Sequence, residues 1–211
     1  MAIIAENKSS GSNSQPVDAG TYVARCIQMI YMGTIEDEFQ GQKKQLKKVR
    51  ITWELPTELK VFKTENGEQP QIISKEFTLS MNEKGTLRKF LQSWRGKAFT
   101  DAEANAFDIT VLLGKPCMLS VIHKVSKTGN TYAEISSVST LIKGMTCPKQ
   151  FNPSLEFNVL KFDEEKFNSF PDFIKDKIKS SKEYKELDNN SIPVPIKPMV
   201  QAEDEDDGLP F

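Results

Sequence analysis

Apolar and polar residues alternate most clearly over residues 48–56, where one side of the chain carries Val49, Ile51, Trp53 and Leu55. A period of two residues is typical of a strand with one face in a core and the other in solvent. We therefore predict that Trp53 is a core residue. The opposite face, which carries lysine and arginine, is expected to be exposed.

Four other segments have strand-like composition, at residues 21–32, 72–80, 116–123 and 131–140. The first is long for a strand, and long strands usually coil or bend, as they do in small barrels. The intervening residues 33–46 are polar and are predicted to form a loop. The Gly129-Asn130 step predicts a hairpin turn between the last two strands.

Residues 80–96 carry the signals of a helix. Ser80–Glu83 matches a capping box and Gly96 a left-handed stop, and between them lies one apolar stripe at Leu87, Phe90, Leu91 and Trp94. Trp94 is accordingly predicted to be a core residue. A second capping box, Thr100–Glu103, predicts a shorter helix ending near Phe107.

The predicted order is β-β-β-α-β-β, so the fold class is mainly β with helices. This order matches the five-stranded oligonucleotide/oligosaccharide-binding (OB) barrel, which commonly has a helix between its third and fourth strands. A split sheet of another topology has the same order and stays an alternative.

The composition divides the chain into four parts. We predict a disordered leader at 1–16, an OB-fold nucleic-acid-binding domain at 17–145, an extension at 146–187, and a proline-containing linker with an acidic tail at 188–211. The extension is predicted to pack an amphipathic helix on the barrel through the stripe Phe170, Phe173, Ile174 and Ile178.

The net charge of -1 hides an asymmetry. The chain has 28 Lys and Arg against 29 Asp and Glu, which by itself argues against a nucleic-acid partner. Residues 203–207 are all acidic, however, whereas residues 17–145 carry 18 basic and 14 acidic side chains, or +4. A mildly basic body is therefore joined to a strongly acidic end.

Several function classes lack support. No segment approaches the ~18 apolar residues of a membrane span, and the first residues do not match a signal peptide. Cys26, Cys117 and Cys147 form no CxxC pair, which favours reduced thiols in a cytoplasmic protein. With His123 as the single histidine, we expect no metal site, no cofactor and no enzymatic activity, although a Cys-His nucleophilic pair is formally an alternative.

The end of the chain combines acidic and apolar residues. Leu209, Pro210 and Phe211 follow the acidic run, and exposed apolar groups do not help solubility. An apolar anchor beside a free carboxylate suits a pocket with a basic rim, where Phe211 fills the pocket and Arg or Lys meets the carboxylate. This pattern predicts a partner-binding tail.

The ending Asp206–Phe211 resembles the C-terminal tip of bacterial and bacteriophage single-stranded DNA-binding proteins. In that family an acidic run closes with Asp-Asp, an apolar residue, Pro and Phe. The match covers Asp206, Asp207, Leu209, Pro210 and Phe211, and Gly208 departs from the pattern. Residues 20–25, 48–56, 129–138 and, more loosely, 174–184 also resemble single-stranded DNA-binding-like proteins of tailed phages.

The resemblance implies a protein that binds single-stranded DNA without sequence preference and protects it in DNA replication, recombination and repair. Its tip would recruit replication and recombination enzymes and compete with DNA for the basic groove. If phage-encoded, it would act in the cytoplasm of the bacterial host, with a homo-oligomer as one option. The alternatives are a strand-annealing recombination mediator and a protein-binding OB-fold adaptor without physiological DNA binding.

Candidate DNA-binding residues follow from what single-strand binding requires, which is cations along a groove and aromatic platforms for bases. An OB barrel offers strands two and three with the two neighbouring loops. The candidates there are Tyr31, Phe39, Lys43, Lys44, Lys47, Lys48, Arg50, Lys124, Lys127 and Tyr132. Other interpretations stay open: Lys43 and Lys44 could solubilise a loop, Phe39 could cover the barrel end, and the tyrosines could be ordinary barrel residues.

Overall fold

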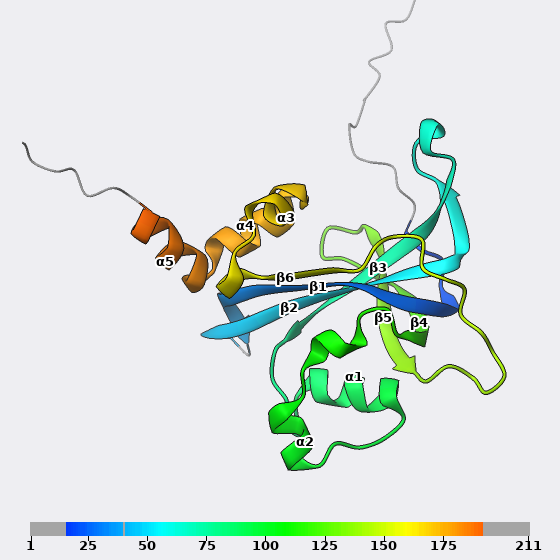
Figure 1. Ribbon diagram of the computed structural model, residues 1–211, viewed down its shortest axis with the longest axis horizontal. Helices are drawn as coiled ribbons and strands as arrows, with labels where there is room; N and C mark the ends of the chain where they lie inside the picture. The colour runs from blue at the N-terminus through cyan, green and yellow to red at the C-terminus, as the bar shows by residue number, and fades with distance from the viewer. Residues whose placement is uncertain (1–15, 40, 192–211) are drawn as a thin grey trace, which may run out of the picture.

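The computed structural model describes residues 16–39 and 41–191, which form a mainly antiparallel sheet of six strands with five α-helices (Figure 1). The strands are β1 Gly20–Phe39, β2 Gln42–Val61, β3 Glu68–Thr78, β4 Pro116–Val125, β5 Thr131–Ser139 and β6 Leu155–Asn158. The α-helices are α1 Thr86–Arg95, α2 Asp101–Ala106, α3 Glu164–Ser169, α4 Asp172–Ser180 and α5 Lys182–Ser191, with short 3-10 helices η1 Thr64–Asn66, η2 Ile109–Leu112 and η3 Val159–Lys161. The predicted order of three strands, a helical region and two strands is confirmed.

The strands lie in the order β3-β2-β1-β4-β5, and β6 pairs with β1 outside this path. Strand β1 is long enough to have two partners along the same edge. Its first part, Gly20–Arg25, pairs antiparallel with β4, and Gln28–Tyr31 then pairs parallel with β6. The extension therefore enlarges the sheet.

The predicted closure into a five-stranded barrel is not formed. Strands β3 and β5 are the two ends of the strand order, and no ladder joins them within the part of the chain that the structure describes. A side chain crosses between them instead: Lys75 Nζ donates to the Ile135 carbonyl at 2.5 Å and lies 3.4 Å from Glu134 Oε1. The lysine thus bonds to a carbonyl at the edge of β5 where a closing strand would pair.

The prediction of a loop at residues 33–46 is wrong, because β1 and β2 continue as a hairpin up to the pair Phe39 and Gln42. A register shift between Tyr31 and Gly33 bends β1 where this hairpin begins. The hairpin has few apolar positions, and its opposed charged residues include Asp37 opposite Lys44. Cross-strand charge pairs stabilise such a ladder without the apolar alternation that predicts strands.

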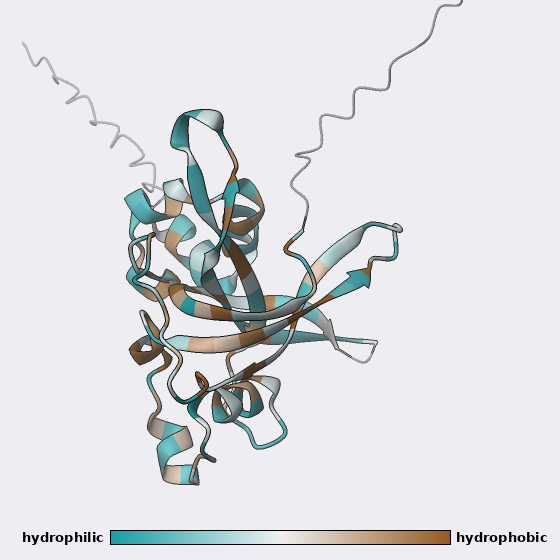
Figure 2. Ribbon diagram, turned by 90° about the vertical axis from the view of Figure 1, so that its right-hand side faces the viewer, coloured by the Kyte–Doolittle hydropathy of each residue, from teal (hydrophilic) through white to brown (hydrophobic). Residues whose placement is uncertain are grey.

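One face of the sheet, here called the inner face, packs on α1 and α2, which lie below the sheet in Figure 1. Trp53 is fully buried there, with ring centroids 5.6 Å from Phe90 and 5.7 Å from Trp94. Both tryptophans are core residues, as predicted. Figure 2 shows hydrophobic colour in the centre of the sheet and hydrophilic colour toward the end of the β2–β3 hairpin.

Helix α1 begins later than predicted. Its N-cap is Gly85, which makes no side-chain cap bond, so the capping box at Ser80–Glu83 is wrong. Asn82 Oδ1 instead accepts from the Lys84 N–H, and a Cβ at Gly85 would lie 2.9 Å from the Asn82 carbonyl oxygen. Gly96 ends the helix in the left-handed region, and Thr100 forms its capping box with Glu103, both as predicted.

The opposite, outer face of the sheet carries a second hydrophobic cluster, which we call the outer cluster. It joins residues of β1 to the extension: Ile30, Met32, Phe157, Val159, Phe167, Phe170, Ile174 and Ile178. The extension folds as three helices rather than the single helix predicted, and these lie on the other side of the sheet from α1 (Figure 1). Phe173 does not belong to the buried stripe, because its side chain is 52% exposed.

Two paired residues of the sheet hold the segment that leads into the extension. Arg25 of β1 donates to the carbonyls of Gly114, Cys147 and Pro148. Its neighbour on β2, the fully buried Glu54, accepts from the backbone N–H groups of Phe151 and Asn152, both at 2.8 Å, and from Asn152 Nδ2 at 2.7 Å. Several hydrogen bonds made by each of these two side chains therefore fix this crossing on the outer face.

Candidate nucleic-acid interface

Two grooves follow the outer side of β3. The first, which we call the Ile72 groove, has a volume of about 390 Å³ and is lined by Pro16, Val17, Arg50, Phe62, Gln71, Ile72, Ile73, Ser74 and Ala133. The second, the Lys48 groove, has a volume of about 560 Å³ and is lined by Lys44, Leu46, Lys48, Glu76, Phe77, Thr78, Ser80, Asn82, Lys84, Gly85 and Thr86. Alternate side chains of one strand therefore border a path along the sheet.

The two grooves meet at an ion pair. Arg50 of the first groove donates to Glu76 of the second, with Nη1 3.1 Å from Oε1. Lys177 of α4 reaches the same carboxylate, with Nζ 2.7 Å from each oxygen. The Arg50 guanidinium also lies 5.3 Å from the centre of the Phe173 ring. Helix α4 is thus fixed to the sheet at the middle of the path.

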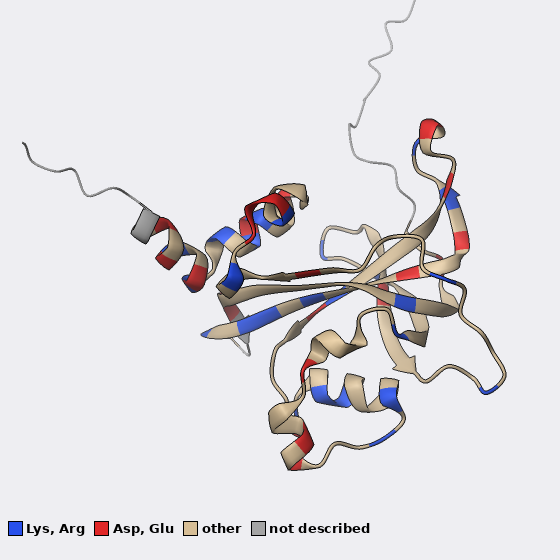
Figure 3. Ribbon diagram, viewed as in Figure 1, with Lys and Arg blue, Asp and Glu red and all other residues tan. Residues whose placement is uncertain are grey.

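The lysines of the β1–β2 hairpin divide between its two faces, because side chains alternate along β2. Lys44 and Lys48 share the parity of Arg50 and line the Lys48 groove. Lys47 lies beside Met29 and Val49 in a cavity of about 360 Å³ on the inner side, and Lys43 shares that parity. Figure 3 shows the basic positions along β2 toward this hairpin. Lys44, Lys48 and Arg50 thus lie on one face, and Lys43 and Lys47 on the other.

Acidic residues of β1 neutralise part of this charge. Lys48 Nζ lies 2.5 Å from Asp37 Oδ2, and Lys43 Nζ lies 2.9 Å from Glu36 Oε1. The hydrogen bond to Glu36 raises the pKa of Lys43 above its ordinary value. A polyanion that binds here therefore has to compete with these carboxylates.

The β4–β5 hairpin carries the other predicted cations. Lys124 lies on β4 opposite Tyr132, and its Nζ is 2.8 Å from Glu134 Oε2. The hydrogen bond from Lys124 lowers the pKa of Glu134, and the same bond raises the pKa of Lys124. Lys127 is exposed in the turn, and Tyr132 is 43% exposed. This hairpin offers an exposed aromatic ring with one neutralised and one exposed lysine.

The remaining aromatic candidates do not line the two grooves. The Tyr31 hydroxyl donates to Glu183 Oε1 at 3.2 Å, and burial together with the nearby carboxylate raises the pKa of Tyr31. Phe39 is the last residue of β1, and its side chain lies outside the described part of the structure. The predicted tail residues are also outside the described residues: Asp206, Asp207, Leu209, Pro210 and Phe211.

Four further side chains at the path were missed from the sequence: Phe62, Lys84, Phe173 and Lys177. A cap at Ser80 predicts Lys84 in the first turn of the helix, but α1 starts after it, at Thr86. Phe173 is predicted to lie in the buried stripe, but α4 begins only at Asp172, and the side chains that it buries are Ile174 and Ile178. Phe173 follows Phe170 by three residues, which also fits one helical stripe, so the spacing alone does not identify Phe173 as exposed.

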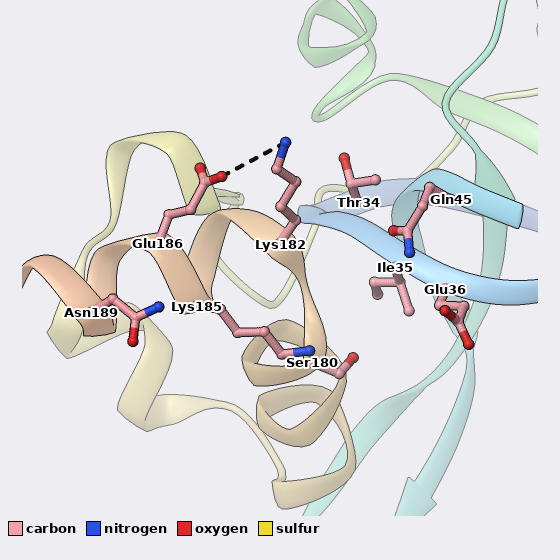
Figure 4. Close-up of a pocket in the computed structure, with 9 residues that line it drawn as sticks. All are labelled: Thr34, Ile35, Glu36, Gln45, Ser180, Lys182, Lys185, Glu186 and Asn189. Atoms are coloured by element: carbon pink, nitrogen blue, oxygen red, sulfur yellow. Dashed lines mark ion pairs between the residues drawn. The ribbon is translucent and has the colours of Figure 1, made fainter.

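Another cavity, of about 490 Å³, lies between the β1–β2 hairpin and helices α4 and α5. Figure 4 shows Thr34, Ile35, Glu36 and Gln45 on the hairpin side, with the remaining lining residues on the helices. The charges here are mixed, since Lys182 lies 3.7 Å from Glu186 and Glu36 faces the same space. This cavity suits a polyanion less well than the Lys48 groove does.

The cysteines are free, and their environment disfavours the thiolate form. Burial raises the pKa of Cys26 to about 12 and also raises the pKa values of Cys117 and Cys147. Within residues 16–39 and 41–191, no group of three His, Cys, Asp or Glu side chains is placed to hold a metal ion. No helix in that part of the chain is long and apolar enough to cross a membrane.

Comparison of the sequence with protein-family models and with curated proteins finds no match.

Proposed function

We propose that the protein binds single-stranded DNA without sequence preference along the outer side of β3. The observation that carries this proposal is the path of two grooves that meet at Arg50. A single strand needs an extended groove with cations for its phosphates and exposed rings for its bases. Lys44, Lys48 and Lys84 supply the cations at one end, and Phe62, which is 47% exposed, supplies a ring at the other.

We assign the sheet to the OB type, in the form of a barrel that stays open between β3 and β5. Two features support this assignment: the strand order β3-β2-β1-β4-β5 and the helices between β3 and β4. Proteins of this fold bind oligonucleotides on strands two and three, beside the loops that follow strands one and four. The two grooves run along that surface.

The acidic tail is proposed to recruit a partner protein. Its five consecutive acids and the closing Leu-Pro-Phe suit a pocket with a basic rim, with Phe211 as the apolar anchor. The same acids would compete with DNA for the lysines of the path. Removal of residues 203–211 should therefore tighten DNA binding.

The test is to titrate fluorescently labelled poly-dT with the full chain and to measure the fluorescence anisotropy of the DNA at a series of salt concentrations. The double variant Lys48→Gln, Lys84→Gln should bind more weakly. It should also lower the slope of log affinity against log salt by about 1.4, because each phosphate contact on a single strand contributes about 0.7.

The matched control removes two exposed lysines outside both grooves, with Lys115→Gln and Lys143→Gln. It has the same net charge as the first double variant. Its salt slope should change less, because these two lysines are distant from the bound strand. Equal losses of affinity and of salt slope in the two double variants would show that the strand does not bind along the two grooves. Failure of both the full chain and the tail truncation to bind poly-dT at low salt would contradict the function itself.

A further inference from the structure

Phe173 is a large apolar side chain that the fold leaves half in solvent. It lies in the first turn of α4, and the next residue, Ile174, is buried in the outer cluster together with Ile178. The ring itself is 52% exposed. An isolated exposed ring is ordinary on a protein surface, so its meaning depends on what holds it in place.

The ring is held by a charged network that spans the sheet and the helix. The Arg50 guanidinium lies 5.3 Å from the ring centre, close enough for a cation–π contact. Arg50 is in turn bonded to Glu76, and Glu76 is bonded to Lys177, which lies one turn after Phe173 on the same helix. The position of the ring relative to β2 and β3 is therefore fixed before any ligand binds.

The ring also stands at the junction of the path. Arg50 lines the Ile72 groove, and Glu76 lines the Lys48 groove. Phe173 contacts Arg50. A chain that passes from one groove to the other therefore passes this ring. Two further cations belong to this junction: Lys177 bonds to Glu76, and Lys48 lines the same groove as Glu76.

Building on the DNA-binding function proposed above, we propose that Phe173 is a stacking site for one unpaired nucleobase of the bound strand, which carries the DNA path from the sheet onto helix α4. The base would stack on the exposed part of the ring, with the Arg50 guanidinium on its other side. A nucleotide matches this site in both its parts, because the base meets an aromatic ring and the flanking phosphates meet cations. An apolar protein side chain would meet the ring but would bring no negative charge to these cations, which Asp37 and Glu76 already pair in the free protein.

A tryptophan in place of Phe173 reports on this contact directly. The two native tryptophans are buried, with Trp53 0% and Trp94 4% exposed, so their emission should change little when DNA binds. In Phe173→Trp, poly-dT should quench the added emission, because the indole stacks on a base. The matched control is Val111→Trp in η2, since Val111 is 53% exposed and its neighbours pack against the inner core. The control should show no quenching.

Affinity gives a second measurement. Phe173→Ala should weaken poly-dT binding about tenfold, within the range found for the loss of one base–aromatic stack. Phe173→Leu keeps an apolar side chain on α4 but cannot stack, so it should be weakened to a similar extent. Circular dichroism and the native tryptophan emission show whether each variant is folded.

The outcomes separate this inference from the function on which it rests. If wild-type protein binds labelled poly-dT while the emission added in Phe173→Trp is not quenched and Phe173→Leu keeps full affinity, the stacking site is wrong and the DNA-binding function stands. If no form of the protein binds poly-dT at low salt, both are wrong. Quenching in Phe173→Trp together with a loss in both Phe173→Ala and Phe173→Leu supports the site.

Discussion

The two faces of the sheet are covered in different ways. On the inner face, alternate positions of β2 pack against α1, which follows soon after in the chain, and the rings of Trp53, Phe90 and Trp94 form a continuous aromatic cluster. On the outer face, β1 packs against helices from the distant extension, and the margin of that contact is held by charged and polar side chains. We infer that the inner face fixes the fold, whereas the contacts of the outer face can be lost while the sheet stays folded.

Truncation of the inner core should have the largest effect. Trp53→Ala removes a fully buried ring, and large-to-small changes of this kind cost about 3–5 kcal/mol. We expect the whole domain to lose stability in one cooperative transition, as measured by urea denaturation followed by circular dichroism.

The matched change on the outer face is Phe170→Ala, which removes a ring that is 4% exposed. Hydrogen exchange should then speed up in α3, α4 and α5 while β1–β5 stay protected, because local clusters can open below the global unfolding free energy. Equal loss of protection over the whole sheet in Phe170→Ala would contradict the difference between the two faces.

The same difference explains which features were predictable from the sequence. The inner core was predictable because both of the patterns that form it are local in the sequence. One is the alternation in β2, and the other is the stripe of Leu87, Phe90, Leu91 and Trp94 in α1. The outer cluster was predictable only in part: the stripe of the extension predicts that Phe170, Ile174 and Ile178 are buried, but not which part of the sheet they cover, because β1 and the extension meet through tertiary contact. No local pattern shows that Ile30 and Met32 are covered by residues near the end of the described chain.

In the candidate site, too, the local features were predictable from the sequence and the tertiary contacts were not. The parity of β2 places Lys48 and Arg50 together, and this followed from the alternation. The partners that neutralise them did not, since Asp37 and Glu76 come from neighbouring strands whose register the sequence does not specify. The contact of Arg50 with Phe173 depends on how α4 docks, so it was also missed.

The junction between the β1–β2 hairpin and α5 should give the next largest effect. Gly33 has a φ of +96°, and a Cβ there would lie 2.7 Å from Glu183 Oε2 and 2.8 Å from Ser181 Cβ. Gly33→Ala should therefore cost about 2–3 kcal/mol, from backbone strain and from displacement of the contacting groups. Thermal unfolding measures the loss.

Gly129 provides the control for backbone strain. Its φ is +84°, and nothing lies within 4 Å of an added Cβ. Gly129→Ala introduces backbone strain without a steric clash, so it should lower the free energy of unfolding less than Gly33→Ala does. A cost as large as that of Gly33→Ala would mean that the contact with α5 contributes nothing.

Glu183 itself should make the outer face sensitive to acid. Burial opposes ionisation of Glu183, but hydrogen bonds from the Thr34 N–H and hydroxyl and from the Tyr31 hydroxyl outweigh it and lower the pKa below the ordinary 4.5. A carboxylate with a lowered pKa contributes stability above its unfolded pKa, and this is lost as pH falls through the folded value.

The variant Glu183→Gln should lose about 1 kcal/mol at pH 7, since hydrogen bonds to a charged group are weakened. Its melting temperature should approach that of the wild type as the pH is lowered from about 5 toward about 3, the range in which such a carboxylate becomes protonated. A difference in melting temperature that stays constant over this range would show that ionisation of Glu183 stabilises nothing.

The smallest expected effect concerns binding at the charged margin of the outer face. Glu76 is the acidic side chain at the junction of the two grooves, so its carboxylate repels a phosphate while it holds Arg50 and Lys177. Glu76→Gln should tighten poly-dT binding about threefold, because both cations become available to the strand at the cost of ion pairs worth about 0–1 kcal/mol each.

The control is Glu65→Gln in η1, which removes the same charge from an exposed position outside both grooves. Weaker binding by Glu76→Gln than by Glu65→Gln would instead mean that the carboxylate contributes more to binding by positioning Arg50 and Phe173 than it costs by repelling a phosphate.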